Sequence, residues 1–294
     1  MLQRDSTVQR VAEATMRHSE PVRVIAVSGG KGGVGKTTVS VNLASALALA
    51  GRQVMLLDGD LGLANVDVLM GISPRYTLAH VLSGERTLQE VIVQAPNGIR
   101  IAPGASGVAR MANLSPAEHI GLVRAFSGLG SEIDTLIVDT SAGIADGVLR
   151  FSQAAQHVLL VIRDEPASIT DAYALMKVLS REHNVQRFRV LVNMTRQPGE
   201  ALGVFQRLQR VTARYLEAVV EFVGEIPDDD MLGRAIREQR PVLDAYPNSK
   251  ASLAFKNLAR LTDTWPIPAG PRGHLEFFVE RLVRRPAAGL EVVQ

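Results

Sequence analysis

The sequence predicts an α/β fold in which a mainly parallel, twisted sheet is flanked by helices on both faces. Seven short runs are almost continuously apolar and rich in β-branched residues, which is typical of strands buried on both faces. Segments with helical periodicity separate most of these runs, as they do in sheets whose strands are joined by crossover helices. A short amphipathic helix is expected near the C-terminal end.

The expected elements follow one another in a regular order. The first helix is rich in Ala, Leu and Val and stops at Gly51, as helices often do at glycine. The expected strands are 22–27, 53–57, 99–102, 135–138, 158–162, 188–192 and 219–223, and the expected helices are 36–50, 115–129, 168–183, 200–217, 229–239 and 249–263. A run rich in Pro and Gly at 266–271 then breaks the pattern. We therefore expect a polar tail at 1–20, one α/β domain at 21–265, and a linker with a tail helix at 266–294.

Composition limits the function classes. The chain has 294 residues, 46% of them hydrophobic, and its 32 basic and 30 acidic residues nearly balance, so it is not a polycation. It contains no cysteine, which excludes disulfides and thiolate metal sites, and its six histidines lack metal-ligand spacing. No apolar run is long enough for a spanning helix, and the N-terminal residues do not resemble a signal peptide. We expect a cytoplasmic protein.

Residues 30–37 read Gly-Lys-Gly-Gly-Val-Gly-Lys-Thr and lie between the first strand and the first helix. Their glycines, followed by Lys36 and Thr37, have the spacing of a Walker A phosphate-binding loop. Backbone N–H groups of such a loop surround a polyphosphate, the lysine reaches its β- and γ-phosphates, and the threonine hydroxyl ligates Mg²⁺. We expect the nucleotide to be bound by Gly30, Lys31, Gly32, Gly33, Val34, Gly35, Lys36, Thr37 and Thr38.

Acidic residues follow two of the predicted strands. Asp58 and Asp60 lie one residue apart after the second run, and Asp139 follows the fourth. Because ligands of α/β sheets bind at the carboxyl ends of the strands, these carboxylates should lie beside the phosphate loop. Asp139 has the Walker B pattern, in which a rigid strand directs an acid at Mg²⁺. We expect Thr37, Asp58 and Asp139 to hold the metal, partly through water.

A second lysine inside the loop, Lys31, narrows the class of P-loop protein. The run Lys-Gly-Gly-Val-Gly-Lys-Thr-Thr resembles the deviant Walker A loop of the MinD/ParA ATPases, and the resemblance covers nearly all of 21–286. It implies that Lys31 crosses a dimer interface to the partner's nucleotide and that Asp60 orients or activates the attacking water. It also implies a switch at Gly143 that senses the γ-phosphate. The catalytic groups would be Asp60, Lys31 and Lys36, in a slow ATPase.

The resemblance also bears on the base. The guanine-reading sequence Asn-Lys-x-Asp does not occur in this chain. Asn193 resembles the family's adenine-contacting asparagine, and Pro227 and Asp228 resemble the loop on the other side of the base. ATP and Mg²⁺ are the cofactors that this implies.

Other segments are similar to the flagellar branch of the family, the FleN/FlhG proteins. They are residues 60–69, 164–174, 249–256 and 271–282. The resemblance implies an ATP-induced homodimer that regulates flagellar number, restrains a FleQ-type transcriptional activator and acts with the GTPase FlhF at the cell pole. Residues 1–20 lack the Asp-Gln-Ala motif with which some relatives stimulate FlhF, so that activity stays open. Glu165-Pro166 stands where MinD has Pro-Glu, so the contact that this dipeptide makes at the MinD dimer interface stays open for this chain.

The tail shows a one-sided apolar stripe. Its members are spaced as on one face of a helix and are Leu275, Phe278, Val279, Leu282 and Val283. Such a short helix needs a surface to fold against, and that surface is either a membrane or the protein's own body. Both surfaces would be used if the tail docks on the body without nucleotide and is released to a membrane when ATP drives dimerisation.

Two other functions compete with the flagellar switch. A ParA-like ATPase would bind DNA non-specifically for partition or positioning, with a steep dependence on salt. The near-neutral charge balance and the amphipathic tail argue against direct DNA binding. A scaffold that binds nucleotide without hydrolysing it is the other alternative, and the presence of Asp60 argues against it.

Overall fold

A single eight-stranded sheet runs through the computed structural model, which describes residues 21–129, 133–268 and 270–283. The strand order is β3-β4-β2-β5-β1-β6-β7-β8, and every pairing is parallel except that of β3 with β4. The strands are β1 (Arg23–Ser28), β2 (Val54–Gly59), β3 (Val93–Gln94), β4 (Arg100–Ala102), β5 (Thr135–Thr140), β6 (His157–Ile162), β7 (Arg187–Thr195) and β8 (Val219–Pro227). The predicted mainly parallel sheet is confirmed.

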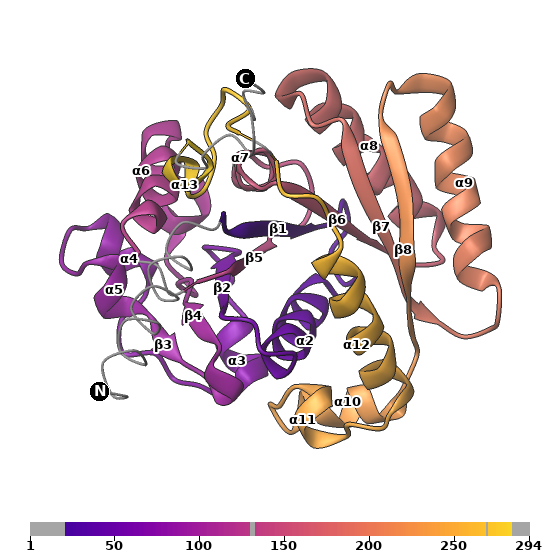
Figure 1. Cartoon of the computed structure of the whole chain (residues 1–294), viewed down its shortest axis with the longest axis horizontal. Coiled ribbons are helices and arrows are strands. Elements are labelled where there is room, and N and C mark those ends of the chain that lie inside the picture. Colours follow the sequence, from indigo (N-terminus) through magenta and orange to yellow (C-terminus); the bar gives the residue numbers. More distant parts are fainter. Residues whose placement is uncertain (1–20, 130–132, 269, 284–294) are drawn as a thin grey trace, which may run out of the picture.

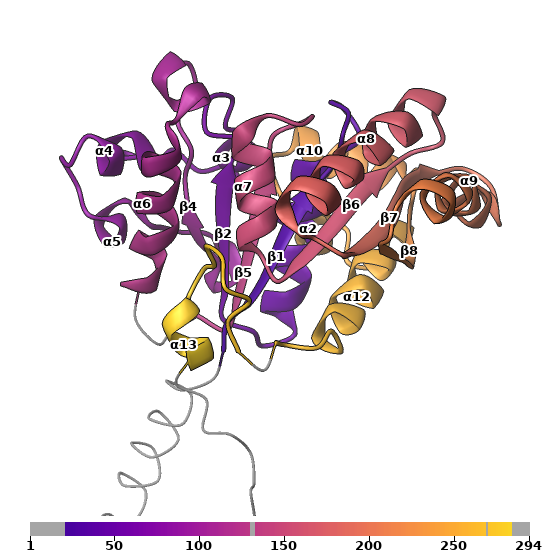
Figure 2. The same cartoon turned by 90° about the horizontal axis from the view of Figure 1, so that it is seen from above.

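Helices cover both faces of the sheet, as Figures 1 and 2 show. One face carries α2 (Lys36–Leu49), α3 (Val66–Met70), α10 (Asp230–Arg237), α11 (Val242–Ala245) and α12 (Lys250–Asp263). The other carries α4 (Leu78–Leu82), α5 (Leu88–Val91), α6 (Pro116–Ser127), α7 (Asp146–Ala154), α8 (Pro166–His183), α9 (Glu200–Tyr215) and α13 (Val279–Val283). Two 3₁₀ turns, η1 (Pro96–Gly98) and η2 (Ala109–Asn113), flank β4.

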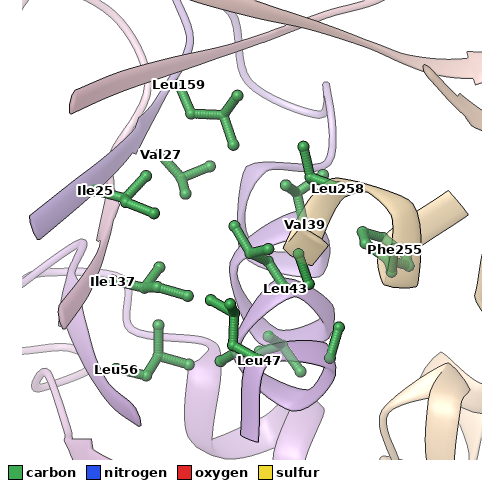
Figure 3. Close-up of a cluster of buried hydrophobic side chains, with 14 of the residues drawn as sticks. Ile25, Val27, Val39, Leu43, Leu47, Leu56, Ile137, Leu159, Phe255 and Leu258 are labelled. Atoms are coloured by element: carbon green, nitrogen blue, oxygen red, sulfur yellow. The ribbon is translucent and has the colours of Figure 1, made fainter. Parts of the chain in front are cut away.

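The core explains why the strands are apolar on both sides. On the α2 face, side chains of β1, β2, β5 and β6 pack against α2 and α12. Figure 3 shows this layer, with Ile25, Val27, Leu56, Ile137 and Leu159 from the sheet facing Val39, Leu43 and Leu47 of α2 and Phe255 and Leu258 of α12. The opposite face has its own clusters, so neither side of the central strands is exposed to water. The site at the strand ends therefore has a rigid base.

Every expected strand and helix of the domain is present, with ends that differ by a few residues. Strand β3 and several short helices were not predicted, and α7 is the most consequential of them. Its sequence opens with Asp146-Gly147, a dipeptide typical of turns, and no side chain caps its first turn. Burial of Val148 and Phe151 against the sheet holds this helix instead.

The tail lies against the protein's own body. After α12 the chain runs to the opposite face, where α13 lies near α6 and α7 (Figures 1 and 2). The N–H of Phe277 donates to the carbonyl of Ala154 at 3.3 Å, and the Phe277 ring packs on Phe126 and Phe151 at centroid distances of 5.4 and 6.3 Å. The expected polar segment at 1–20 and the residues after 283 lie outside the described residues.

The predicted C-terminal helix is present, but among the described residues of the tail it is confined to Val279–Val283, so it begins after the first member of the predicted stripe. Phe278 has a φ of 53°, a left-handed conformation that interrupts any helix there. Of the predicted stripe, Phe278 and Leu282 are buried, Leu275 and Val279 are half-buried, and Val283 is 67% exposed. Arg281 is buried and donates to the carbonyl of Ile133 at 3.1 Å. Docking on the body is thus the arrangement that the structure contains.

Phe277→Ala should test how firmly the tail docks. The side chain is 1% exposed between two other rings, so its loss should lower the free energy of unfolding by about 3 to 5 kcal/mol. Denaturant unfolding of the whole protein measures this. The exposed Val283→Ala is the matched control and should change it by less than about 0.5 kcal/mol. Equally small effects of both changes would show that the tail does not dock.

Candidate functional site

The phosphate loop joins β1 to α2 at the carboxyl edge of the sheet (Figure 1). Two of its glycines leave no room for a side chain. A Cβ on Gly30 would lie 2.2 Å from the carbonyl of Asp171 in α8, and a Cβ on Gly35, whose φ is 92°, would lie 2.3 Å from the amide nitrogen of Asn193. No side chain caps the N-terminus of α2, so its first N–H groups and its dipole are directed at this loop. This is an anion-binding backbone.

Lys36 is the buried cation of the site. It is 8% exposed, and its Nζ lies 3.5 Å from the carbonyl oxygen of Lys31 on the other side of the loop. Burial lowers the pKa of Lys36, while Asp139 and Asp60 act in the opposite direction. The predicted phosphate-binding lysine is thus held inside the loop among carboxylates.

Asp58 and Asp139 lie side by side on adjacent strands. They are paired in the register of β2 with β5, and each is 1% exposed. Burial raises the pKa of both carboxyls, and for Asp58 repulsion from Asp139 raises it further. Two buried like charges favour the binding of a cation, since a cation offsets their repulsion.

The two carboxylates have different partners. Asp139 accepts hydrogen bonds from the hydroxyls of Thr37 and, at 2.8 Å, Ser40, both in α2. Oxygen ligands of this kind fit Mg²⁺, so Thr37 and Asp139 would hold a metal that offsets the charge of the phosphates. Asp58 was also predicted to be a metal ligand. Its oxygens accept backbone N–H bonds from Asp60 at 3.2 Å and from Asn65 and Val66 at 3.0 Å each, and its role as a metal ligand stays a prediction. Asp58 thus organises the loop that carries Asp60.

Asp60 begins that loop and is half-buried. Burial raises the pKa of Asp60, while the backbone N–H of Leu63 and the charge of Lys36 lower it. It lines a hollow together with Ser141 and with His119 of α6. The carboxylate predicted to orient water therefore lies within the electrostatic range of Lys36.

The segment after Asp139 is tied to the phosphate loop. The N–H of Gly143 donates to the carbonyl of Gly29 at 3.2 Å, and Gly143 has a φ of 90°. The hydroxyl of Thr140 donates to the carbonyl of Val27 at 3.1 Å and lies at the same distance from the hydroxyl of Ser28. This segment is therefore hydrogen-bonded to the residues at the start of the phosphate loop, and the role of Gly143 as a sensor of the γ-phosphate stays a prediction.

Lys31 pairs with an acid that lies outside the phosphate loop. Its Nζ lies 2.5 Å from Oε2 of Glu165, the residue just before α8, and Nε of Arg163 lies 3.3 Å from the other oxygen of the same carboxylate. All three side chains are between about a quarter and two fifths exposed. Lys31 and Lys36 thus have different environments, one partly exposed and one buried.

The predicted base-binding residues come together at the ends of β7 and β8, where Thr195 pairs with Pro227. The amide nitrogen of Asn193 donates to the carbonyl of Val34 at 2.8 Å, and its oxygen accepts the N–H of Met194 at 3.0 Å. Asn193 therefore supports the phosphate loop directly, a role that was not predicted. The N–H of Asp228 donates to the carbonyl of Thr195 at 2.8 Å. Contact of Asn193 with adenine stays a prediction.

Ser40 was missed by the sequence analysis, because a serine one turn into an apolar helix carries no signal of its own. Its spacing from Thr37 puts both hydroxyls on one face of α2, and that face points at Asp139. A serine that shares a helix face with the threonine of the phosphate loop is therefore the sequence signal for such a residue.

Ser40→Ala should weaken binding of Mg²⁺·ADP by about tenfold, as loss of a ligand-orienting hydrogen bond commonly does. Affinity for ADP in EDTA should not change, and calorimetry with and without Mg²⁺ measures both. The matched control is Ser45→Ala in the same helix, whose hydroxyl lies 3.5 Å from Asp244. An equal loss with and without metal would show that Ser40 acts on the fold and not on Asp139.

Comparisons with known proteins agree with this geometry. The family model described as "ParA: NUBPL iron-transfer P-loop NTPase" matches residues 21–262. Antiactivator FleN of Pseudomonas aeruginosa is 57% identical over 277 residues, which cover 94% of this chain and 99% of that protein. Flagellum site-determining protein YlxH of Helicobacter pylori is 33% identical, over 89% of this chain and 90% of that protein.

Among solved structures, the septum site-determining protein MinD of Pyrococcus horikoshii, complexed with Mg-ADP, superposes with a TM-score of 0.69. Its sequence identity is 26%, over 83% of this chain and 97% of that one. The phosphate loop, the acid pair, the sheet order and these similarities lead to one assignment. The chain belongs to the MinD/ParA family of P-loop NTPases, and within it to the flagellar FleN/FlhG branch.

Proposed function

We propose that this protein is an ATP-driven dimerising switch that regulates flagellar number. It would act as an antiactivator of a FleQ-type transcriptional activator, together with the GTPase FlhF. Similarity to an antiactivator and to a flagellum site-determining protein supports the flagellar role. The observation that carries the dimer is that Lys31 is partly exposed and paired with Glu165, whereas Lys36 is buried in the phosphate loop.

Nucleotide binding would use groups that the fold already holds in place. The loop N–H groups and Lys36 would bind the phosphates, and Thr37 with Asp139 would hold Mg²⁺, which neutralises phosphate charge when bound. The Mg-ADP complex of the MinD protein of Pyrococcus horikoshii supports the choice of cofactor for this chain. ATP rather than GTP is proposed because the guanine-reading tetrapeptide is absent from the sequence.

Hydrolysis would depend on Asp60. Its carboxylate is half-buried near Lys36 and begins a loop whose backbone is bonded to Asp58. Asp60 would accept a hydrogen bond from the attacking water and so orient it towards the γ-phosphate. Gly143, bonded to the phosphate loop through Gly29, would report the presence of that phosphate to α7.

Two copies of the protein would then share the negative charge of each γ-phosphate. The loops around Asp60 and Gly143 would form the dimer face, and Lys31 of each copy would reach the phosphates of the other. Loss of the γ-phosphate would remove this attraction and release the dimer. Slow hydrolysis of ATP would give the dimer a long lifetime, as a regulatory switch requires.

Association with the membrane at the cell pole is a further part of this proposal. Of the described residues, none belongs to a helix that is long and apolar enough to span a bilayer. A peripheral contact through the tail would need its release, since Phe278 packs in the core of the body and Leu282 is buried. Dimerisation could supply that release through α7, because Phe277 is bonded to the end of this helix.

Asp60→Ala should retain ATP binding but slow hydrolysis by at least about 100-fold, as expected for loss of a group that acts on the attacking water. Dimers should therefore accumulate in ATP and persist during sedimentation. Wild-type protein in ADP is the control and should sediment as a monomer. Variant dimers that dissociate as fast as wild-type dimers in ATP would contradict the role of Asp60.

Lys31→Ala should weaken ATP-dependent dimerisation by at least about tenfold while changing monomer affinity for ADP by less than about twofold, because only the dimer would place this charge near phosphate. Sedimentation gives the first quantity and calorimetry the second. Lys177→Ala, an exposed lysine on α8, is the control for loss of one positive charge. Equal losses in dimerisation and in ADP affinity would reject the crossing role.

A further inference from the structure

Glu165 holds Lys31 within its own chain, and it does so together with a second cation. One oxygen of its carboxylate lies 2.5 Å from Nζ of Lys31, and the other lies 3.3 Å from Nε of Arg163. The two cations come from different parts of the fold, since Lys31 belongs to the phosphate loop and Arg163 follows β6. The carboxylate therefore bridges the loop to the strand end beside it.

We infer that Glu165 is a positioning residue that restrains Lys31 in the monomer, and that Arg163 sets how strongly it does so. This inference rests on the proposed function, in which Lys31 must leave its own chain to reach a partner's nucleotide. In the proposed dimer, Lys31 would extend to the phosphates of the second copy, and its Nζ would leave the position 2.5 Å from Glu165 that it holds here. Dimerisation would therefore compete with the ion pair.

Arg163 allows Lys31 to leave Glu165 and to return to it. When Lys31 leaves, Arg163 still neutralises Glu165, so no carboxylate is left without a counter-charge. The two cations also compete for one carboxylate, which weakens the hold on each of them. The partial exposure of all three side chains keeps the pair in the range of surface ion pairs, which are readily broken.

Glu165 has no visible structural duty that would explain its position otherwise. It stands at the N-cap of α8, but its side chain makes no capping hydrogen bond, and Pro166 follows it as the first residue of the helix. Its N–H donates to the carbonyl of Arg163 at 2.7 Å, a bond that does not involve the side chain. Replacement by glutamine keeps this backbone and the size of the side chain while removing the charge.

The size of the effect follows from symmetry. An exposed ion pair typically favours its bound form by a factor of about 1.4 to 5. Each dimer requires release of two such pairs, one from each copy, so the dimer dissociation constant should change by the square, about 2- to 25-fold. Whether the dimer dissociation constant falls or rises depends on whether Glu165 or Arg163 is replaced.

The experiment measures the dimer dissociation constant by sedimentation in saturating Mg²⁺·ATP, with Asp60→Ala present throughout to block turnover. Glu165→Gln should tighten the dimer about 2- to 25-fold, because Lys31 is free from the start. Arg163→Gln should weaken it about twofold or more, because Lys31 then has the carboxylate to itself. Glu182→Gln, at an exposed position on the same helix, should leave it unchanged.

Opposite signs for two neighbouring substitutions are hard to obtain from a general loss of structure. A weaker dimer with Glu165→Gln would overturn the inference and would mean that this carboxylate supports the interface. Equal changes with Glu165→Gln and Arg163→Gln would also overturn it.

A second readout needs no dimer. Acetic anhydride should acylate Lys31 about twofold or more faster in nucleotide-free Glu165→Gln than in the parent protein, with Lys177 as the internal reference read by mass spectrometry. An unchanged rate overturns the inference even if ATP drives dimerisation. A raised rate in a protein that forms no dimers in ATP supports the restraint on Lys31 and refutes the proposed dimer switch.

Discussion

Burial of three ionisable groups at one edge of the sheet is the constraint on which the rest of the structure depends. Lys36, Asp58 and Asp139 are each less than a tenth exposed, and burial disfavours the charged form of every one of them. Such groups are costly unless they are paired, hydrogen-bonded or offset by a bound ion. The fold supplies part of the compensation through the hydroxyls of α2 and the N–H groups around Asp60. A magnesium nucleotide would supply the remainder, since it adds positive charge beside the acids and negative charge beside the lysine.

The same hydrogen bonds join the site to the parts that would move. Asp58 is bonded to the loop that begins with Asp60, and the segment after Asp139 is bonded to the phosphate loop through Gly143. That segment leads into α7, and the far end of α7 is bonded to the docked tail through Phe277. A change in charge between β2 and β5 can therefore reach the opposite edge of the sheet through one short helix. This continuity is the physical basis for proposing that nucleotide, dimer and tail respond together.

Much of this arrangement could be predicted from the sequence, because strong local signals coincide with it. The glycine spacing of the loop, the apolar strands and the acids that follow them are together sufficient to place Lys36, Thr37 and Asp139 at one edge. Three features could not be predicted, because each depends on contacts between residues distant in sequence. Asn193 supports Val34, Ser40 orients Asp139, and Glu165 restrains Lys31. The start of the tail helix was predicted too early, because Phe278 has a left-handed backbone. Phe277, which lies outside the predicted stripe, packs on the rings of Phe126 and Phe151.

Thermal unfolding of the protein with ADP and Mg²⁺, together and separately, tests the central claim most directly. If the buried acids require a cation and the lysine requires an anion, ADP and Mg²⁺ together should raise the melting temperature clearly more than the sum of the two added alone. The account predicts that ADP in EDTA gives only a small increase, because its phosphates then lie near uncompensated carboxylates. An increase with ADP in EDTA as large as that with Mg²⁺·ADP would show that Asp58 and Asp139 do not set the charge requirement of the site.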